Sequence, residues 1–313
     1  MTFLKKISSW RLVLKKLFKE FSTDYTLKYS AALAYYTVFS IAPLLVILTA
    51  LFGFMFGKEA MQGQIYSQLK NLIGSKSAIQ IQDVIKNIHL NQNNLFATIV
   101  SIVILVIGAT SIFNEIQDSI NKIWGLRIKS SKVWWQMLFR RLLSFILILV
   151  VGAIMIFSLL LNTLIGAFGT FISRYIENYS VYVIQWTEAI FSLVILSFLF
   201  SILFKVLPDA KIPWKIVLIG GLITAVLFSI GKLGISFYIS KSNLTSLYGA
   251  AGSFIIFMTW VYYSSIILYL GAEFTKVFAK LYGKEIIPND YAEWVIIEKK
   301  TLPSVPSNNK DLG

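Results

Sequence analysis

Six long apolar stretches dominate this sequence and limit what it can fold into. They cover residues 30–56, 95–113, 142–165, 182–204, 214–239 and 251–270. A helix of about 20 mostly apolar residues crosses the hydrocarbon core of a bilayer. It also satisfies its own backbone hydrogen bonds, which lipid cannot do for it. The pattern therefore predicts an all-α, polytopic membrane bundle with about six transmembrane helices.

The composition agrees with a membrane protein and excludes several kinds of chemistry. Charged residues make up 14% of the 313 residues and hydrophobic residues 57%, whereas a soluble domain carries about 25% charged residues. The chain has no cysteine, and its one histidine, His89, cannot form a metal-binding cluster. No Walker A, G-x-S-x-G or H-E-x-x-H motif occurs. We expect no catalytic residues, no metal and no cofactor, so the chain is not expected to be an enzyme.

The basic residues between the apolar stretches predict the orientation. Of the 29 lysines and arginines, 22 fall in the N-terminal segment, the second and fourth connections and the C-terminal tail. Six fall on the opposite side, and Lys232 lies within the fifth stretch. Because cytoplasmic segments are enriched in Lys and Arg, both termini are expected in the cytoplasm. The net charge of +14 then reflects orientation and attraction to anionic lipid headgroups. No nucleic-acid partner is expected, and nothing indicates a protein partner.

The segments outside the spans have patterns of their own. In the arm of residues 1–29, apolar residues recur every three or four positions among lysines, which predicts a basic amphipathic helix lying in the cytoplasmic interface. The loop of residues 57–94 predicts two short amphipathic helices around Gly74. The membrane domain is expected over residues 30–283. Residues 284–313 form a cytoplasmic tail, whose end from Thr301 is expected to be disordered.

Polar groups near the inner halves of three spans are candidates for a functional site, because such groups are costly in lipid unless paired or hydrated. The predicted cavity-lining residues are Tyr35, Tyr36, Ser40, Asn114, Glu115, Asp118, Asn121, Tyr262, Tyr263 and Glu273. With the N-terminus inside, the first, second and sixth spans place these groups at a similar depth. They could line one inward-facing hydrated cavity. They could also serve helix packing, an interfacial tyrosine belt or a solvated helix end.

Individual residues near these groups leave further alternatives open. Pro43 removes a backbone hydrogen bond and predicts a kink in the first span. Glu273 could be hydrated or paired with Lys276. Lys232 could extend toward the interface, or it could pair with Glu188 or Glu273.

Three segments carry a resemblance to a known family. They are SAALAYYTVFSIAPLL from Ser30, NEIQDSINKIWG from Asn114, and YGAAGSFIIFMTWVYYSSIILYLGAEFTKVFA from Tyr248. From about Trp10 to Gly283 the chain resembles the YihY/virulence factor BrkB family of bacterial membrane proteins. The resemblance implies a multi-pass protein of the bacterial inner membrane with six spans. This family was formerly labelled ribonuclease BN, but the sequence offers neither metal ligands nor a basic aromatic RNA surface.

Two functional hypotheses follow. The first is the transport or translocation of an amphiphilic, lipid-like envelope substrate through the inward-facing cavity. The alternative is a non-transporting membrane scaffold or envelope-assembly factor, which a solidly packed bundle would favour. A ribonuclease activity ranks a distant third.

Overall fold

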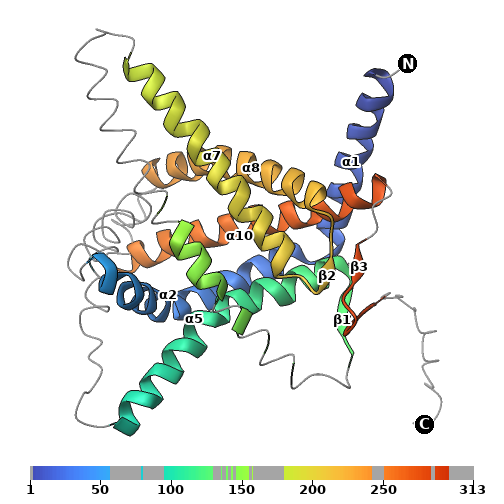
Figure 1. Ribbon diagram of the computed structural model, residues 1–313. Helices are drawn as coiled ribbons and strands as arrows, with labels where there is room; N and C mark the ends of the chain where they lie inside the picture. Colours follow the sequence, from blue (N-terminus) through green and yellow to red (C-terminus); the bar gives the residue numbers. More distant parts are fainter. Residues whose placement is uncertain are drawn as a thin grey trace, which may run out of the picture.

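Long helices make up most of the structure. The computed structural model describes residues 3–56, 79, 95–129, 135, 139, 142–143, 146–154, 157, 180–241, 250–282 and 286–295. Within these residues the labelled helices are α1 (Phe3–Thr23), α2 (Thr26–Phe56), α5 (Leu95–Trp124), α7 (Ser180–Val206), α8 (Trp214–Lys241) and α10 (Ala250–Leu281) (Figure 1). The predicted, mostly helical fold is therefore confirmed.

Five of the predicted spans fall within these helices. The predicted spans 182–204 and 214–239 differ from α7 and α8 by two residues at most at any end, whereas α5 and α10 continue eleven residues past the predicted ends. In the part of the chain that the structure describes, three helices contain stretches long and apolar enough to cross a membrane: Ala189–Val206, Trp214–Ile235 and Phe254–Leu281. Residues 142–143, 146–154 and 157 are helical within the third predicted span, and its remainder lies outside the described residues. The total of six spans and the interfacial position of α1 stay predictions.

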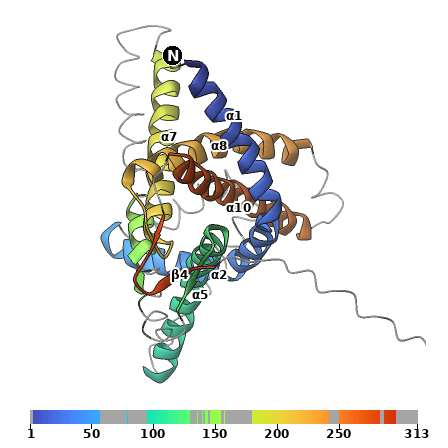
Figure 2. The ribbon, with the colours of Figure 1, turned by 90° about the vertical axis from the view of Figure 1, so that its right-hand side faces the viewer.

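Helix α10 lies at the centre of the arrangement. It contacts α8 on one side and α2 on the other, while α7 pairs with α8 and α5 pairs with α2. Figure 2 shows α1 running down to the end of α10, against which it packs. Val13 and Leu17 of α1 are buried there, whereas Leu14 and Phe18 are exposed. The N-terminal arm is thus attached to the bundle through one face.

Small residues let α8 approach both of its neighbours. A Cβ atom at Gly220 would lie 2.0 Å from Thr275 Oγ1 of α10, and one at Gly271 would lie 1.9 Å from Thr224 Oγ1 of α8. On the other side, a Cβ at Gly221 would lie 2.2 Å from Ser201 Oγ of α7. Without a hydrophobic driving force between helices in lipid, such close backbone contact is a main source of attraction.

Among the described residues, four short strands accompany the helices, and the sequence analysis did not predict them. They are β1 (Leu126–Ile128), β2 (Ala210–Lys211), β3 (Ile287–Pro288) and β4 (Ala292–Trp294). Antiparallel pairs form between β1 and β4 and between β2 and β3. The segment after α10 therefore supplies backbone hydrogen bonds to the connections that follow α5 and α7. This part of the predicted tail is ordered, and residues 296–313 lie outside the described residues.

The connection after α5 depends on a glycine. Gly125 has a φ of +72°, a left-handed conformation that favours glycine at the end of a helix. A Cβ there would lie 3.3 Å from Val295 O, and the Val295 N–H donates to Gly125 O at 2.8 Å. The chain can therefore turn sharply out of α5 and receive β4 beside it.

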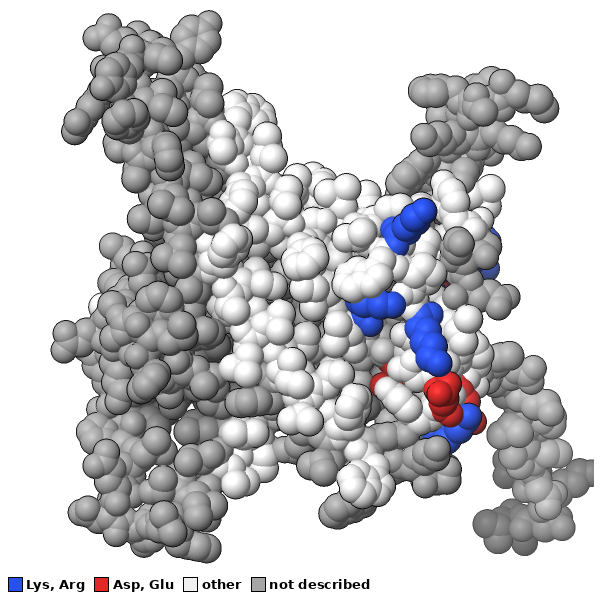
Figure 3. Space-filling view, viewed as in Figure 1, with Lys and Arg blue, Asp and Glu red and all other residues white. Residues whose placement is uncertain are grey.

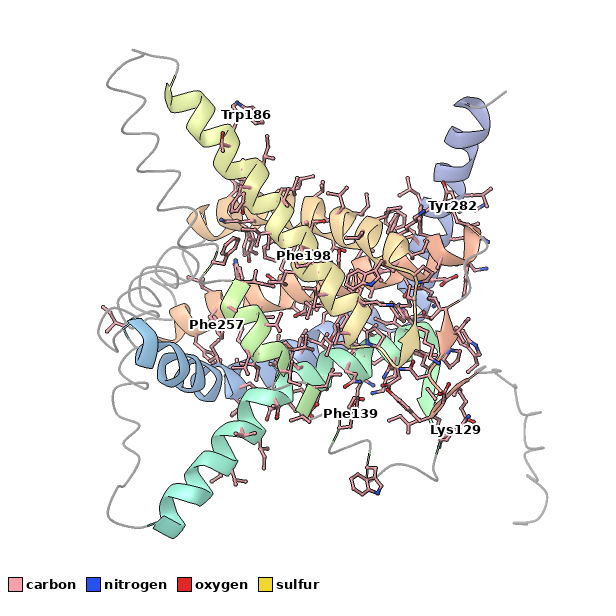
Figure 4. The ribbon with its side chains drawn as sticks, in the orientation of Figure 1. Lys129, Phe139, Trp186, Phe198, Phe257 and Tyr282 are labelled. Carbon is pink, nitrogen blue, oxygen red and sulfur yellow. The ribbon has the colours of Figure 1, made fainter. Side chains whose placement is uncertain are left out.

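Charged residues gather at the end of the bundle that carries these strands. Figure 3 shows the described lysine, arginine and acidic side chains of this face on its right, with an uncharged described surface beside them. Lys129 and Tyr282 lie at that end, whereas Trp186 lies near the opposite end of α7 (Figure 4). Exposed apolar side chains, among them Phe198, Ile230 and Leu233, cover the helices. This surface suits helices that face acyl chains.

Candidate functional site

A pocket lies where α2, α5, α7, α8 and α10 meet. Its volume is about 300 Å³. It is lined by Leu33, Thr37, Ile41, Ile112, Phe200, Leu203, Phe228, Phe257, Trp260, Val261, Ser264, Ser265 and Leu268. Aromatic side chains form a large part of the wall, and the ring centroids of Phe228 and Trp260 are 6.2 Å apart in an edge-to-face arrangement.

The polar residues around this pocket have little to offer a polar ligand. Thr37 Oγ1 donates a hydrogen bond to Leu33 O at 2.7 Å, and Ser265 Oγ donates to Val261 O at 2.7 Å. Both hydroxyl groups thus satisfy carbonyls of their own helices, as serine and threonine commonly do in helices. The pocket is consequently suited to an apolar group.

A cluster of charged residues joins α1 to α10 near the charged end of the bundle. Lys276 Nζ donates to Glu273 Oε1 at 3.0 Å and to Asp24 Oδ2 at 2.9 Å. The same nitrogen lies 2.9 Å from Glu20 Oε2. Glu273 is fully buried, whereas the side chains of Glu20 and Asp24 are about one quarter exposed. Lys276 therefore bridges three carboxyl groups: Glu20 of α1, Asp24 in the turn that follows α1, and Glu273 of α10.

The surroundings of Glu20 favour its ionised form. Burial alone would raise the pKa of this carboxyl, but a hydrogen bond with Glu273 and the nearby Lys276 ammonium outweigh it, and the pKa lies below its ordinary value. Lys280 adds a smaller attraction. Glu20 thus carries a negative charge at neutral pH.

Polar groups on α10 connect the pocket to this cluster. Ser265, Tyr269, Glu273 and Lys276 follow one another at steps of four and three residues, so they share one face of the helix. Tyr269 is fully buried. Leu268 at the pocket and Glu273 are five residues apart, which corresponds to about 7 Å along the helix axis. The apolar pocket and the charged cluster are therefore close neighbours.

A second buried carboxylate, Asp209, follows α7 and was not among the predicted site residues. Gln117 Nε2 donates to its Oδ1 at 3.1 Å, and Asn121 Nδ2 donates to its Oδ2 at 2.7 Å. The Tyr291 hydroxyl donates to Oδ1 at 3.3 Å, and Asp209 N donates to Asn121 Oδ1 at 2.9 Å. This network joins α5, the α7–α8 connection and the C-terminal strands. Three neutral side-chain groups donate to the carboxylate, and these hydrogen bonds tie the three parts of the chain together.

The predicted cavity residues of α2 do not share one environment. Tyr35 and Tyr36 are exposed, with ring centroids 6.0 Å apart, whereas Ser40 is buried. Tyr35 also contacts the exposed Phe39, with ring centroids 4.9 Å apart. Helix α2 runs continuously through the position of Pro43, and the predicted kink stays a prediction.

The predicted residues of α5 belong to different contacts. Asn114 is half-buried and Asp118 is exposed. Glu115 accepts a hydrogen bond from Ser119 Oγ at 3.2 Å, and burial raises the pKa of its carboxyl, which lies past the predicted end of the second span. Asn121 is buried against Asp209.

The remaining candidates lie on α8 and α10. Tyr262 and Tyr263 are half-buried, and the Tyr263 ring lies against Gly231 of α8. Glu273 pairs with Lys276, one of the two alternatives left open for it, and Lys232 is exposed. The side chain of Glu188 lies outside the described residues. None of the ten predicted residues is among those lining the 300 Å³ pocket described above.

Sequence comparison places the chain among known membrane proteins. The model of the family described as virulence factor BrkB matches residues 17–290. The chain belongs to this family. The BrkB resemblance of the three sequence segments is thereby confirmed, and the chain is a membrane protein.

Curated relatives extend this finding. A UPF0761 membrane protein of Saccharophagus degradans is 27% identical over 84% of this chain and 59% of its own length. One of Teredinibacter turnerae is 25% identical over 89% of this chain and 64% of its own length. One of Pseudoalteromonas atlantica is 26% identical over 81% of both chains. The chain thus spans about 60% of the length of the first two relatives. No solved structure matches it significantly.

Proposed function

We propose that this BrkB-family protein translocates an amphiphilic, lipid-like envelope substrate in the bacterial inner membrane, with both termini in the cytoplasm. The observation that carries the proposal is the apolar pocket of about 300 Å³ at the junction of five helices. Its size is at the lower end of the range for small-molecule sites, about 300–1,000 Å³. An acyl chain matches the apolar, partly aromatic wall.

The position of the charged cluster supports an amphiphile rather than a purely apolar ligand. Glu273 and Lys276 follow the pocket-lining Leu268 on the same helix. A substrate with its acyl chain in the pocket could therefore place its headgroup toward the charged end of the bundle. The proposal involves no catalysis and no nucleic acid. The polar, inward-facing cavity of the sequence analysis stays a prediction beside it.

The test is lipid exchange between leaflets in proteoliposomes. Purified protein, reconstituted with fluorescent analogues of bacterial envelope lipids, is expected to accelerate their exposure to a quencher outside the vesicles. Ser264→Phe adds an aromatic ring at the pocket and should slow this exchange several-fold. Ile230→Phe is the matched control, because Ile230 is exposed on α8 and its replacement should leave the rate unchanged.

The scaffold alternative has its own supporting observation. The contacts of Gly220 with Thr275 and of Gly271 with Thr224 hold α8 and α10 closely together and oppose movement between them. A wild-type protein that accelerates no envelope lipid would contradict translocation and favour the scaffold. Equal exchange rates for the wild type and Ser264→Phe would show that the pocket is not the route.

A further inference from the structure

The charges around Lys276 do not balance if every group is ionised. Glu20 of α1, Asp24 just after α1 and Glu273 of α10 each bring one carboxyl oxygen to within 4.8 Å of the other two. The single ammonium of Lys276 contacts all three. Lys280 is exposed and acts on Glu20 from farther away. With one ammonium against three carboxylates, the immediate cluster would keep two uncompensated negative charges beside a fully buried glutamate.

The hydrogen-bond partners of the carboxyl oxygens indicate which groups bind a compensating proton. Glu273 Oε2 is buried, and no group among the described residues donates a hydrogen bond to it, whereas Glu20 Oε2 lies 2.9 Å from Lys276 Nζ. A carboxyl oxygen of each side chain lies within 4.8 Å of one of the other. Two ionised carboxylates are both acceptors and repel each other, so one proton between them would convert this contact into a hydrogen bond.

We propose that Glu20 and Glu273 share one proton at neutral pH and form a proton-binding site at the contact of α1 with α10. The proton resides on Glu273, which is the fully buried partner, while the more exposed Glu20 accepts the hydrogen bond. This assignment gives Glu273 Oε2 a hydrogen-bond partner in Glu20 and removes one of the two excess negative charges. It does not depend on the translocation proposed above.

A divalent cation is a weaker explanation of the same geometry. Three carboxyl oxygens at this spacing could hold an ion. The Lys276 nitrogen, however, already lies 2.9–3.0 Å from one oxygen of each carboxyl group and occupies the position of the cation. A metal would have to displace this ammonium, whereas a proton completes the arrangement as it stands.

Loss of the shared proton would weaken the packing of α1 against α10. Removing it leaves two carboxylates facing each other across the α1–α10 contact, where Lys276 and the weaker attraction of Lys280 oppose their repulsion. Other titratable groups lie nearby, because Tyr29 of α2 interacts electrostatically with both Asp24 and Glu115. The site therefore links the protonation of a buried glutamate to the attachment of the N-terminal helix.

Infrared spectroscopy of the full-length protein in lipid nanodiscs tests this proposal. The carbonyl stretch of a protonated carboxylic acid is measured at pH 7 for the wild type, Glu273→Gln and Glu20→Gln. Both variants should lose one carboxylic-acid band relative to the wild type. In Glu20→Gln the new amide donates to Glu273, so the proton is no longer required.

Glu293→Gln provides the matched control, since Glu293 is exposed on β4 and its replacement should leave the band unchanged. Any band from Glu115 is common to all four proteins and cancels in the differences. Retention of the full wild-type band in either Glu273→Gln or Glu20→Gln would overturn the proposal. Translocation activity does not enter this measurement, so its absence would leave the result intact.

Discussion

At the scale of single residues, two glycine–threonine contacts set how closely α8 and α10 approach. Thr224 and Thr275 each donate a hydrogen bond to the carbonyl of a glycine four residues earlier, at 2.7 Å. Each threonine then lies against the glycine of the opposite helix. The helices are thus joined by a reciprocal pair of small contacts rather than by large side chains.

Adding a methyl group at these glycines should destabilise the bundle. Gly271→Ala would place a Cβ 1.9 Å from Thr224 Oγ1, so the helices must separate, at a cost of about 1–3 kcal/mol. Gly234→Ala is the matched control, because a Cβ at Gly234 meets nothing within 4 Å. Unfolding in detergent should show a clear decrease in the free energy of unfolding for Gly271→Ala and little or no decrease for Gly234→Ala. Equal stability of the two variants would contradict this packing.

Asp209 shows which kind of residue sequence reasoning missed. Its amide partners Gln117 and Asn121 precede it by 92 and 88 positions, so no local pattern connects them. The available signal was a single carboxylate in a short connection between two apolar stretches. Lys276 was recognised as a partner of Glu273. Its hydrogen bond to Asp24, just after α1, spans 252 positions and was equally invisible in the sequence.

At the scale of elements, hydrophobic length predicts helices well and short strands poorly. The predicted spans 182–204 and 214–239 nearly coincide with α7 and α8 because uninterrupted apolar residues define them. In contrast, β2 comprises only Ala210 and Lys211 and exists because β3 pairs with it. A two-residue strand has no periodicity of its own, so the all-α expectation overlooked it.

Helix α1 should separate from α10 when Glu20 is protonated. The folded-state pKa of Glu20 lies below its ordinary value of 4.5. The ionised carboxylate therefore stabilises the contact of α1 with α10 above that pH, and this stabilisation is lost as the pH falls through the lower folded value. Spin labels at Leu14→Cys and Tyr282→Cys, both exposed sites in a chain without cysteine, report the separation of the two helices. The separation should be constant near neutral pH and increase as the pH falls below the ordinary value of 4.5.

The glutamine variant identifies the residue responsible. Glu20→Gln cannot titrate, so its change in label separation on acidification should be smaller than that of the labelled parent. A separation that stays constant down to low pH in the parent would contradict the assignment. An equal change in both proteins would show that another group controls α1.

At the scale of the whole molecule, one end concentrates the charges and the long-range polar contacts. The Asp209 network, the two small sheets and the Lys276 cluster all lie where α2 and α8 begin and α5, α7 and α10 end. Helices α2 and α8 thus run away from this end, whereas α5, α7 and α10 run toward it. The apolar pocket could not be predicted, because its lining comes from five helices whose facing side chains only the packing reveals.

The orientation of this charged end is the claim on which the account rests, and cysteine accessibility tests it most directly. The chain contains no cysteine, so single cysteines at Lys15, Lys129, Lys211, Lys300, Lys76 and Arg174 can each be labelled alone. In intact spheroplasts a membrane-impermeant maleimide should label the cysteines at Lys76 and Arg174 and reach the other four only after permeabilisation. Labelling of Lys15→Cys and Lys300→Cys from opposite sides of the membrane would contradict the account.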